Sequence, residues 1–294
     1  MSIPNAAITI GLFDSGVGGL SIWQAVRRRL PYCATLYVAD NAHCPYGPRP
    51  PREVRRFSAA ITRFLLTQGA ELIVVACNTA SAAALRWLRA HFSVPFVGLE
   101  PAVKPAVQQT RSGHVGVLAT QGTVKGALFR TTVVRYAHGV TLHIQTDDRL
   151  VQCVERGQID APETEQLLRD YLQPMVDAGV DQLVLGCTHY PFLLPVMRRI
   201  LPPEVTVIDP ADAVALQVER CVRSLEGQDS RVRFGNGPSE YRFFVTAAPD
   251  VLQSLLVHST GREWPVERLA WRTGHLALAS EHSDWGTRSD GGQV

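Results

Sequence analysis

The sequence GLFDSGVGGL at positions 11–20 decides the fold class, because it runs from an apolar strand into a glycine-rich loop and then a helix. A second segment, GVLATQGTV at 116–124, has the same layout. Further along each half of the chain a strand ends in a cysteine, in VVACNTA at 74–80 and in VLGCTHY at 184–190. The same order at similar spacing predicts two α/β lobes related by a pseudo-twofold axis.

Short apolar runs alternate with amphipathic helical stripes along most of the chain, a pattern typical of parallel sheets flanked by helices. The runs that predict strands are 8–13, 34–39, 72–76, 94–99, 114–119, 183–186 and 205–208. The helical stripes lie at 22–30, 54–65, 167–175 and 214–225, and 241–256 predicts one more strand and helix. We therefore expect an α/β protein of two pseudo-symmetric lobes, each a mostly parallel sheet flanked by helices, with the active site in the cleft between them.

The length of 294 residues favours two domains of ordinary size. We expect residues 1–99 plus 212–272 to form the first lobe and residues 100–211 the second. Periodicity is lost beyond about Trp271, so residues 273–294 are predicted to be a flexible tail.

Composition excludes several classes of function. A net charge of +2 is too small to indicate binding of nucleic acid or an anionic membrane. The N-terminus does not have the layout of a secretory signal, and no apolar stretch approaches the roughly 18 residues that a membrane span needs. Six cysteines without a CxxC pair do not suggest a disulfide framework, so the expected location is the cytoplasm. Neither a dinucleotide fingerprint nor metal-ligand spacing is present, and we expect no cofactor.

The two cysteine loops are the strongest candidates for chemistry. Cys77 is followed by Asn78 and Thr79, and Cys187 by Thr188 and His189. A helix is expected after each cysteine, and its free N–H groups would attract anions and lower the thiol pKa. A single cysteine beside a strand is usually a small buried hydrophobe. Two cysteines in matching loops at the same edge of matching lobes favour a pair of reactive thiols.

The loop that begins at Asp14 and Ser15 does not match a phosphate-binding pattern, since it lacks both the G-x-G-x-x-G spacing and a P-loop lysine. An aspartate here suits an ammonium group or a proton relay to a thiol, although both residues could simply cap the following helix. His189 is a plausible acid or base at neutral pH, or a surface histidine. The Pro45-Tyr46-Gly47 segment alone predicts no more than a turn.

Taken together, five motifs resemble those of glutamate racemases. They are DSGVGGLS (14–21), PYG (45–47), ACNTAS (76–81), ATQGTV (119–124) and GCTHYP (186–191), and they occur in that family's order and spacing. The resemblance extends from about Ile8 to Pro210 and continues more faintly to about Trp271.

The resemblance implies cofactor-independent interconversion of L- and D-glutamate, with D-glutamate supplied for peptidoglycan. It implies that Cys77 and Cys187 are the two acid/base residues, assisted by Asp14 and His189 respectively. It further implies substrate contacts, in which the α-carboxylate is held by Asn78, Thr79 and Thr188, the side-chain carboxylate by Ser15, Tyr46 and Gly47, and the cleft is lined by Thr120 and Thr123. A homodimer is the family expectation, and some glutamate racemases are thought to bind DNA gyrase.

Two segments depart from the family pattern. Thr146-Asp147-Asp148 stands where many members have Ala-Cys-Pro, ahead of a retained Val-Glu-x-Gly stretch at 154–157. Gly126-Ala127-Leu128-Phe129 replaces a frequent Ser-x-x-Tyr. The first departure puts substrate affinity in question, because it changes a loop near the cleft.

Four alternatives remain at this point. A racemase acting on aspartate or a hydantoin would use the same two-thiol logic. A Cys-His-Asp hydrolase would use one covalent nucleophile and leave the second cysteine without a role. A zinc site built from Asp14, Cys77, Cys187 and His189 would lack the usual clustered spacing. A gyrase-binding role could coexist with catalysis.

Overall fold

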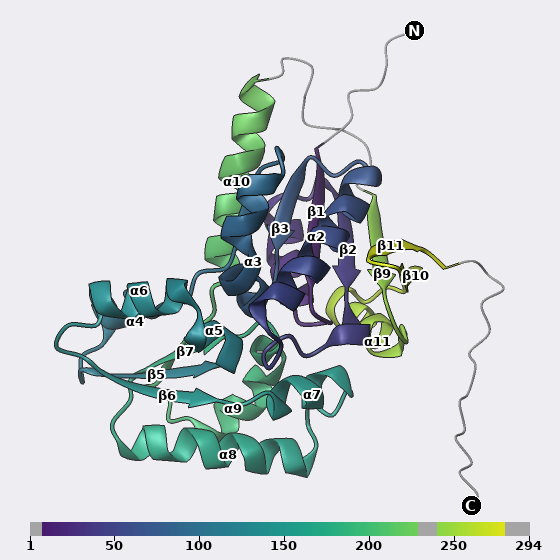
Figure 1. Ribbon diagram of the computed structural model, residues 1–294. Coiled ribbons are helices and arrows are strands. Elements are labelled where there is room, and N and C mark those ends of the chain that lie inside the picture. Colours follow the sequence, from purple (N-terminus) through teal and green to yellow (C-terminus); the bar gives the residue numbers. More distant parts are fainter. Residues whose placement is uncertain (1–7, 229–239, 280–294) are drawn as a thin grey trace, which may run out of the picture.

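The computed structural model describes residues 8–228 and 240–279, which fold into two lobes, each built on its own sheet (Figure 1). The first sheet has the order β11-β10-β9-β2-β1-β3-β4. Its strands are β1 (Thr9–Asp14), β2 (Ala34–Ala39), β3 (Leu72–Val75), β4 (Phe96–Gly98), β9 (Tyr241–Val245), β10 (Val266–Arg272) and β11 (His275–Leu278). The second sheet has the order β6-β5-β7-β8, with β5 (His114–Ala119), β6 (Thr141–Thr146), β7 (Gln182–Gly186) and β8 (Thr206–Ile208).

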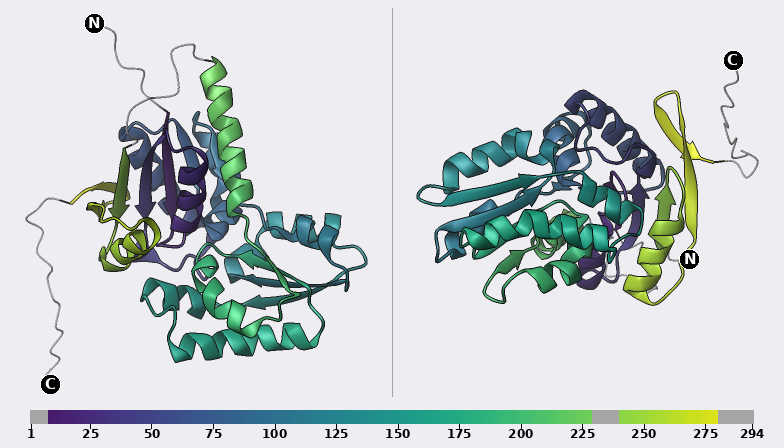
Figure 2. Two further views of the ribbon diagram at one scale, coloured as in Figure 1. Left: turned by 180° about the vertical axis from the view of Figure 1, so that it is seen from behind. Right: turned by 90° about the horizontal axis from the view of Figure 1, so that it is seen from below.

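Helices cover both faces of each sheet (Figure 2). In the first lobe, α1 (Leu20–Arg29) and α10 (Ala211–Gln228) pack on one face, while α2 (Pro51–Thr67) and α3 (Asn78–His91) pack on the other. In the second lobe, α4 (Val103–Gln109) and α6 (Ala127–Tyr136) lie on one face, with α7 (Arg149–Glu155), α8 (Pro162–Asp177) and α9 (Leu194–Ile200) on the other. The remaining elements are α5 (Gln121–Lys125), α11 (Asp250–Thr260) and the 3₁₀ turns η1 (Asn41–His43) and η2 (Tyr190–Leu193).

Alternation along the strands explains this layering. In β3, Leu72 and Val74 join the core beneath α1 and α10, whereas Ile73 and Val75 join the core beneath α2 and α3. Because both faces are buried, such a strand is a continuous apolar run and not an alternating one. The apolar runs of the sequence therefore located these strands, and 34–39 and 114–119 match β2 and β5 residue for residue.

The predicted internal repeat is present in the topology. β1 pairs in parallel with β2 and β3, and β5 pairs in parallel with β6 and β7, so both lobes contain the same order of four strands. Cys77 and Cys187 follow the equivalent strands β3 and β7. The predicted α/β class with two mostly parallel, helix-flanked sheets is confirmed.

Three strands were not predicted, and each lies near an edge. β6 is half-exposed and reads TLHIQT, without an apolar run. β10 and β11 form an antiparallel hairpin. Because Leu269 and Leu276 of this hairpin are buried, the folded part of the chain extends past 272 into the segment predicted to be a tail. Residues 280–294 of that predicted tail lie outside the described residues, and the lobe boundaries at 99/100 and 211/212 stay a prediction.

No helix within residues 8–228 and 240–279 combines the length and the apolar character needed to cross a membrane.

Candidate active site between the two lobes

The loop after β1 is organised by Asp14, which is fully buried. Its carboxylate accepts hydrogen bonds from the backbone N–H of Ser15 at 2.6 Å and of Gly19 at 2.5 Å. The hydroxyl of Thr188, from the opposite lobe, donates to the same carboxylate at 3.1 Å. Because Gly19 is the N-cap residue of α1, Asp14 holds the loop at the start of this helix and also links the two lobes.

Cys77 is the N-cap residue of α3, and its Sγ accepts a hydrogen bond from the Ala80 N–H at 3.4 Å. The thiol is 4% exposed and lies 3.8 Å from the Ser15 Oγ. Burial, reinforced by the negative charge of Asp14, raises the pKa of this thiol well above its usual value despite the helix N–H. The expectation that the helix start would lower this pKa is therefore wrong, because burial outweighs one backbone hydrogen bond.

Cys187 is followed by a 3₁₀ turn and not directly by an α-helix. η2 begins at Tyr190, Pro191 occupies its first turn, and α9 begins only at Leu194. The expected helix N-terminus is thus absent at this thiol. The nearest polar partner is instead His189, whose Nδ1 lies 3.7 Å from the Cys187 Sγ.

His189 is buried, which excludes the surface-histidine alternative. Its Nε2 lies 2.6 Å from an Oε1 oxygen of Glu155, at the end of α7. Burial lowers the pKa of His189, but hydrogen bonds with Cys187, Cys44 and Glu155 outweigh burial and raise this pKa well above its usual value. Glu155 therefore favours a protonated imidazole next to the Cys187 thiol.

Glu155 was not among the predicted site residues, although the retained Val-Glu-x-Gly stretch contained the signal. The same oxygen also accepts a hydrogen bond from the Val17 N–H at 2.7 Å. A Cβ at Gly16 would lie 1.9 Å from this carboxylate, and a Cβ at Gly18 would lie 2.3 Å from the His189 ring. The glycines of the first loop thus make room for side chains of the opposite lobe.

The two thiols line one narrow cavity of about 10 Å³, room for about one water molecule. Ten of the predicted site residues line it, namely Ser15, Tyr46, Gly47, Cys77, Asn78, Thr79, Thr120, Cys187, Thr188 and His189, together with Pro45 and Val151. The two that do not line it lie directly behind, since Asp14 contacts Thr188, and Thr123 contacts the Thr120 hydroxyl at 2.9 Å.

Asn78 is the most informative of the lining residues. It is 4% exposed, yet neither its amide nitrogen nor its amide oxygen has a hydrogen-bond partner. Leaving a buried polar group unpaired costs about 1–3 kcal/mol, so such groups are rare in folded proteins. An amide left unpaired in a wall of the cavity is a ready donor for a ligand.

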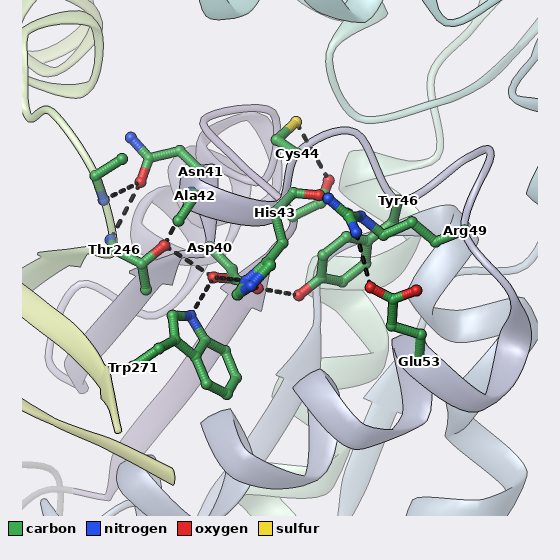
Figure 3. Close-up of polar contacts among 12 residues, drawn as sticks. Asp40, Asn41, Ala42, His43, Cys44, Tyr46, Arg49, Glu53, Thr246 and Trp271 are labelled. Atoms are coloured by element: carbon green, nitrogen blue, oxygen red, sulfur yellow. Dashed lines mark hydrogen bonds and ion pairs between the residues drawn. The ribbon is translucent and has the colours of Figure 1, made fainter. Parts of the chain in front are cut away.

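Tyr46 is positioned by Asp40 at the end of β2 (Figure 3). The Tyr46 hydroxyl donates to the buried Asp40 carboxylate at 2.6 Å, and Thr246 and Trp271 donate to the same carboxylate at 2.8 Å each. The tyrosine hydroxyl is thus held inside the first lobe. Segments more than 200 residues away along the chain fix the loop that carries Tyr46 and Gly47.

The segment Thr146-Asp147-Asp148, the first departure from the family pattern, lies at the rim of this cavity. Asp147 accepts hydrogen bonds from the hydroxyl of Tyr171 and from the backbone N–H of Arg149 at 2.6 Å. Asp148 has a buried, unpaired Oδ1 that would lie 2.1 Å from a Cβ placed at Gly47. The departure therefore places a carboxyl group beside a predicted substrate-binding residue.

The alternative zinc site of Asp14, Cys77, Cys187 and His189, which lacked the usual ligand spacing in the sequence, is not the set of potential ligands that the fold assembles. Among the described residues, a different group, Cys44, Glu155 and His189, has its potential ligand atoms within 4.8 Å of one another. The carboxylate and the imidazole of that group already bind each other.

Comparison with known proteins identifies the family. The family described as Asp/Glu/Hydantoin racemase matches residues 21–218. A glutamate racemase of Roseiflexus sp. is 51% identical over 219 residues, 74% of this chain and 80% of that protein. A glutamate racemase of Pseudomonas aeruginosa is 45% identical over 258 residues, 87% of this chain and 94% of that protein. The chain belongs to the glutamate racemase family.

Solved glutamate racemases share its fold. The Escherichia coli enzyme in complex with L-glutamate and the activator UDP-MurNAc-ala superposes with a TM-score of 0.78 at 29% identity, covering 93% of this chain and all of that one (100%). The Thermus thermophilus glutamate racemase in complex with β-chloro-D-alanine gives 0.72 at 37% identity, covering 91% and 98%. The protein is thus an isomerase, as the sequence motifs predicted, and the hydrolase alternative loses its support.

Proposed function

We propose that this glutamate racemase interconverts L- and D-glutamate by moving the α-proton between Cys77 and Cys187. The observation that carries the proposal is that two buried thiols, which follow equivalent strands of the two lobes, line one narrow cavity. Two bases are needed because a single base would return the proton to the face it came from. One thiolate removes the proton and the opposing thiol supplies another, and their roles exchange with the hand of the substrate.

Each thiol has its own partner. The raised pKa of Cys77 keeps it protonated in the free enzyme, and Asp14, whose own pKa is raised mainly by burial, is able to take up its proton. On the other face, the His189 imidazolium held by Glu155 stabilises the Cys187 thiolate. The ammonium group of the amino acid adds a positive charge that favours either thiolate.

Substrate carboxylates would be held by donors from both lobes. We assign the α-carboxylate to Asn78, Thr79 and Thr188, because the amide of Asn78 has no other partner. The hydroxyls of Thr79, Thr120 and Thr123 form a chain across the lobes, with O–O distances of 2.8 Å and 2.9 Å. Ser15, Tyr46 and Gly47 would bind the side-chain carboxylate, with Tyr46 contributing its ring and backbone since its hydroxyl is engaged by Asp40.

The narrow cavity, lined almost entirely by buried side chains, supplies the stabilisation that the carbanion needs. Preorganised donors in a site without bulk water act more strongly on developing charge than they do in solution. A volume of about 10 Å³ cannot admit glutamate, so the lobes must separate for binding and product release.

The test is incubation of the purified protein with L-glutamate in D₂O without added cofactor, following optical activity by circular dichroism and α-deuterium by mass spectrometry. We expect loss of optical activity together with deuterium incorporation. Turnover of aspartate or hydantoins in the same assay, with glutamate left unchanged, would contradict the assigned substrate.

Single-thiol variants test the two-base assignment. Cys77→Ala and Cys187→Ala should each lose racemisation by several orders of magnitude. Each should still exchange the α-proton of one enantiomer with retention, and the two variants should prefer opposite enantiomers. Cys221→Ala, on α10 away from the cavity, is the matched control. Near wild-type racemisation in either site variant would overturn the assignment.

Several finer expectations belong with this proposal. We propose that the D-glutamate produced is used for peptidoglycan synthesis, that the protein acts in the cytoplasm, and that it forms a homodimer. Sedimentation analysis tests the dimer. A DNA gyrase assay with a Cys77→Ala variant separates any gyrase-binding role from catalysis.

A further inference from the structure

Two larger cavities flank the narrow substrate cavity, and the charges of their lining side chains differ. The first, which we call the basic cavity, has a volume of about 470 Å³ and shares Gly47 and Thr79 with the substrate cavity. The second has a volume of about 210 Å³ and shares Pro45 and Val151 with it. Either cavity could become the route to the thiols when the lobes separate.

Every charged side chain that lines the basic cavity is cationic. These side chains are Arg49, Arg55, Lys125 and Arg130. The charged residues lining the other cavity are the acids Glu155 and Asp250. Glutamate carries two carboxylates and one ammonium group, so its net negative charge is attracted to the basic cavity and repelled from the other.

Most of the positive charge in the basic cavity is uncompensated. Arg49 forms an ion pair with Glu53 at 2.8 Å. The Arg55 Nε, in contrast, donates to a backbone carbonyl, and the Lys125 Nζ donates to the neutral amide of Gln121 at 3.0 Å. Burial, together with the charge of Asp147, raises the pKa of the nearby Asp148, and Lys125 only opposes that rise.

The cations come from both sides of the cleft. Arg49 lies just before α2 and Arg55 lies in the second turn of that helix, both in the first lobe. Lys125 and Arg130 lie on α5 and α6 of the second lobe. An anion in this cavity is therefore attracted to both lobes at once. It would favour closure of the lobes behind the substrate.

We propose that the basic cavity is the antechamber through which dicarboxylate substrates reach the two thiols and from which products leave. This inference rests on the proposed function. It adds a selection step, since amino acids without a second carboxylate are not concentrated there. Because Arg55, Lys125 and Arg130 are exposed to solvent, their attraction should fall steeply with ionic strength, the Debye length being about 10 Å at 0.1 M and about 3 Å at 1 M.

The test is the salt dependence of steady-state kinetics in a Lys125→Glu/Arg130→Glu double variant. At low salt we expect kcat/KM for L-glutamate to fall about tenfold, through a higher KM with kcat within about twofold, because a long-range attraction acts alike on ground state and transition state. At about 1 M salt the variant and the wild type should converge. An Arg86→Glu/Arg198→Glu double variant, which makes the same change of charge on α3 and α9 outside the cavity lining, is the control and should behave as wild type.

Three outcomes would overturn the proposal that the basic cavity is the antechamber. A double variant with wild-type kcat/KM at low salt would remove the electrostatic role, and a loss of equal size at every salt concentration would indicate a local structural effect. An increase in kcat/KM in Asp250→Lys larger than the decrease in the double variant would place the route in the other cavity. Racemisation by the wild type is measured first, so failure of the proposed function is recognised separately.

Discussion

The pairing of Glu155 with His189 offers the sharpest test of how the second thiol is activated. Glu155→Gln keeps the shape of the side chain and can still accept the Val17 N–H, but it removes the negative charge 2.6 Å from the His189 Nε2. A hydrogen bond to a charged partner contributes about 1.5–3 kcal/mol. If that energy stabilises the imidazolium that supports the Cys187 thiolate, its loss lowers kcat by about 10- to 100-fold, at 1.4 kcal/mol per factor of ten.

The pH profile separates this role from a merely structural one. The pKa of His189 is raised in the folded enzyme, so the imidazolium persists at neutral pH and is lost as pH rises through that raised value. Removing the Glu155 charge lowers this pKa, and the alkaline limb of kcat should move to lower pH. The assay is racemisation followed by circular dichroism across pH, with Glu163→Gln in the exposed first turn of α8 as the matched control. A variant with reduced activity but an unshifted alkaline limb would refute the reasoning.

Three further predictions follow from single contacts. Asn78→Ala should raise the KM for glutamate by about tenfold or more while leaving the unfolding midpoint unchanged or higher, since the deleted amide has no partner in the free protein; an unchanged KM would contradict its role in binding. Gly18→Ala should reduce activity about a hundredfold, because the new Cβ would lie 2.3 Å from the His189 ring and displace it; wild-type kinetics would show that the lobes adjust freely. Asp147→Asn should lower the urea midpoint at neutral pH. Burial alone would raise the pKa of Asp147, but hydrogen bonds from Tyr171 and Arg149 lower it overall. The contribution of Asp147 to stability is therefore present above the unfolded pKa of 3.8 and is lost as pH falls through the lower pKa of the folded state. A midpoint difference that persists in strong acid would contradict that linkage.

The pseudo-twofold arrangement was predictable because its causes are local. Parallel strands buried on both faces must be apolar throughout, and so the runs ending near Cys77 and Cys187 were visible without any tertiary information. Strand β6 was missed for the complementary reason, since its partly exposed side chains alternate too weakly to form a run. The hairpin of β10 and β11 was missed as well.

The residues of the cavity could also be anticipated from motifs, but their partners could not. Tyr46 was expected among the residues that hold the side-chain carboxylate of the substrate. The sequence did not indicate that its hydroxyl donates to Asp40, a carboxylate that also binds Trp271, 231 residues along the chain. In the sequence, Glu155 stood out only as part of the Val-Glu-x-Gly stretch at 154–157, which follows the family pattern. Its contact with His189 arises because α7 of one lobe reaches the glycine loop of the other.

The sequence by itself thus determined the two lobes, the pair of thiols and the donors beside them, because strand burial and loop composition are properties of neighbouring residues. Only the tertiary structure decided the chemical state of those groups. The pKa of Cys77 is raised and not lowered, since burial and the charge of Asp14 together outweigh one helix N–H. The burial of a group and the charges around it depend on residues that are distant in the chain. Both are therefore established only when the fold brings those residues together.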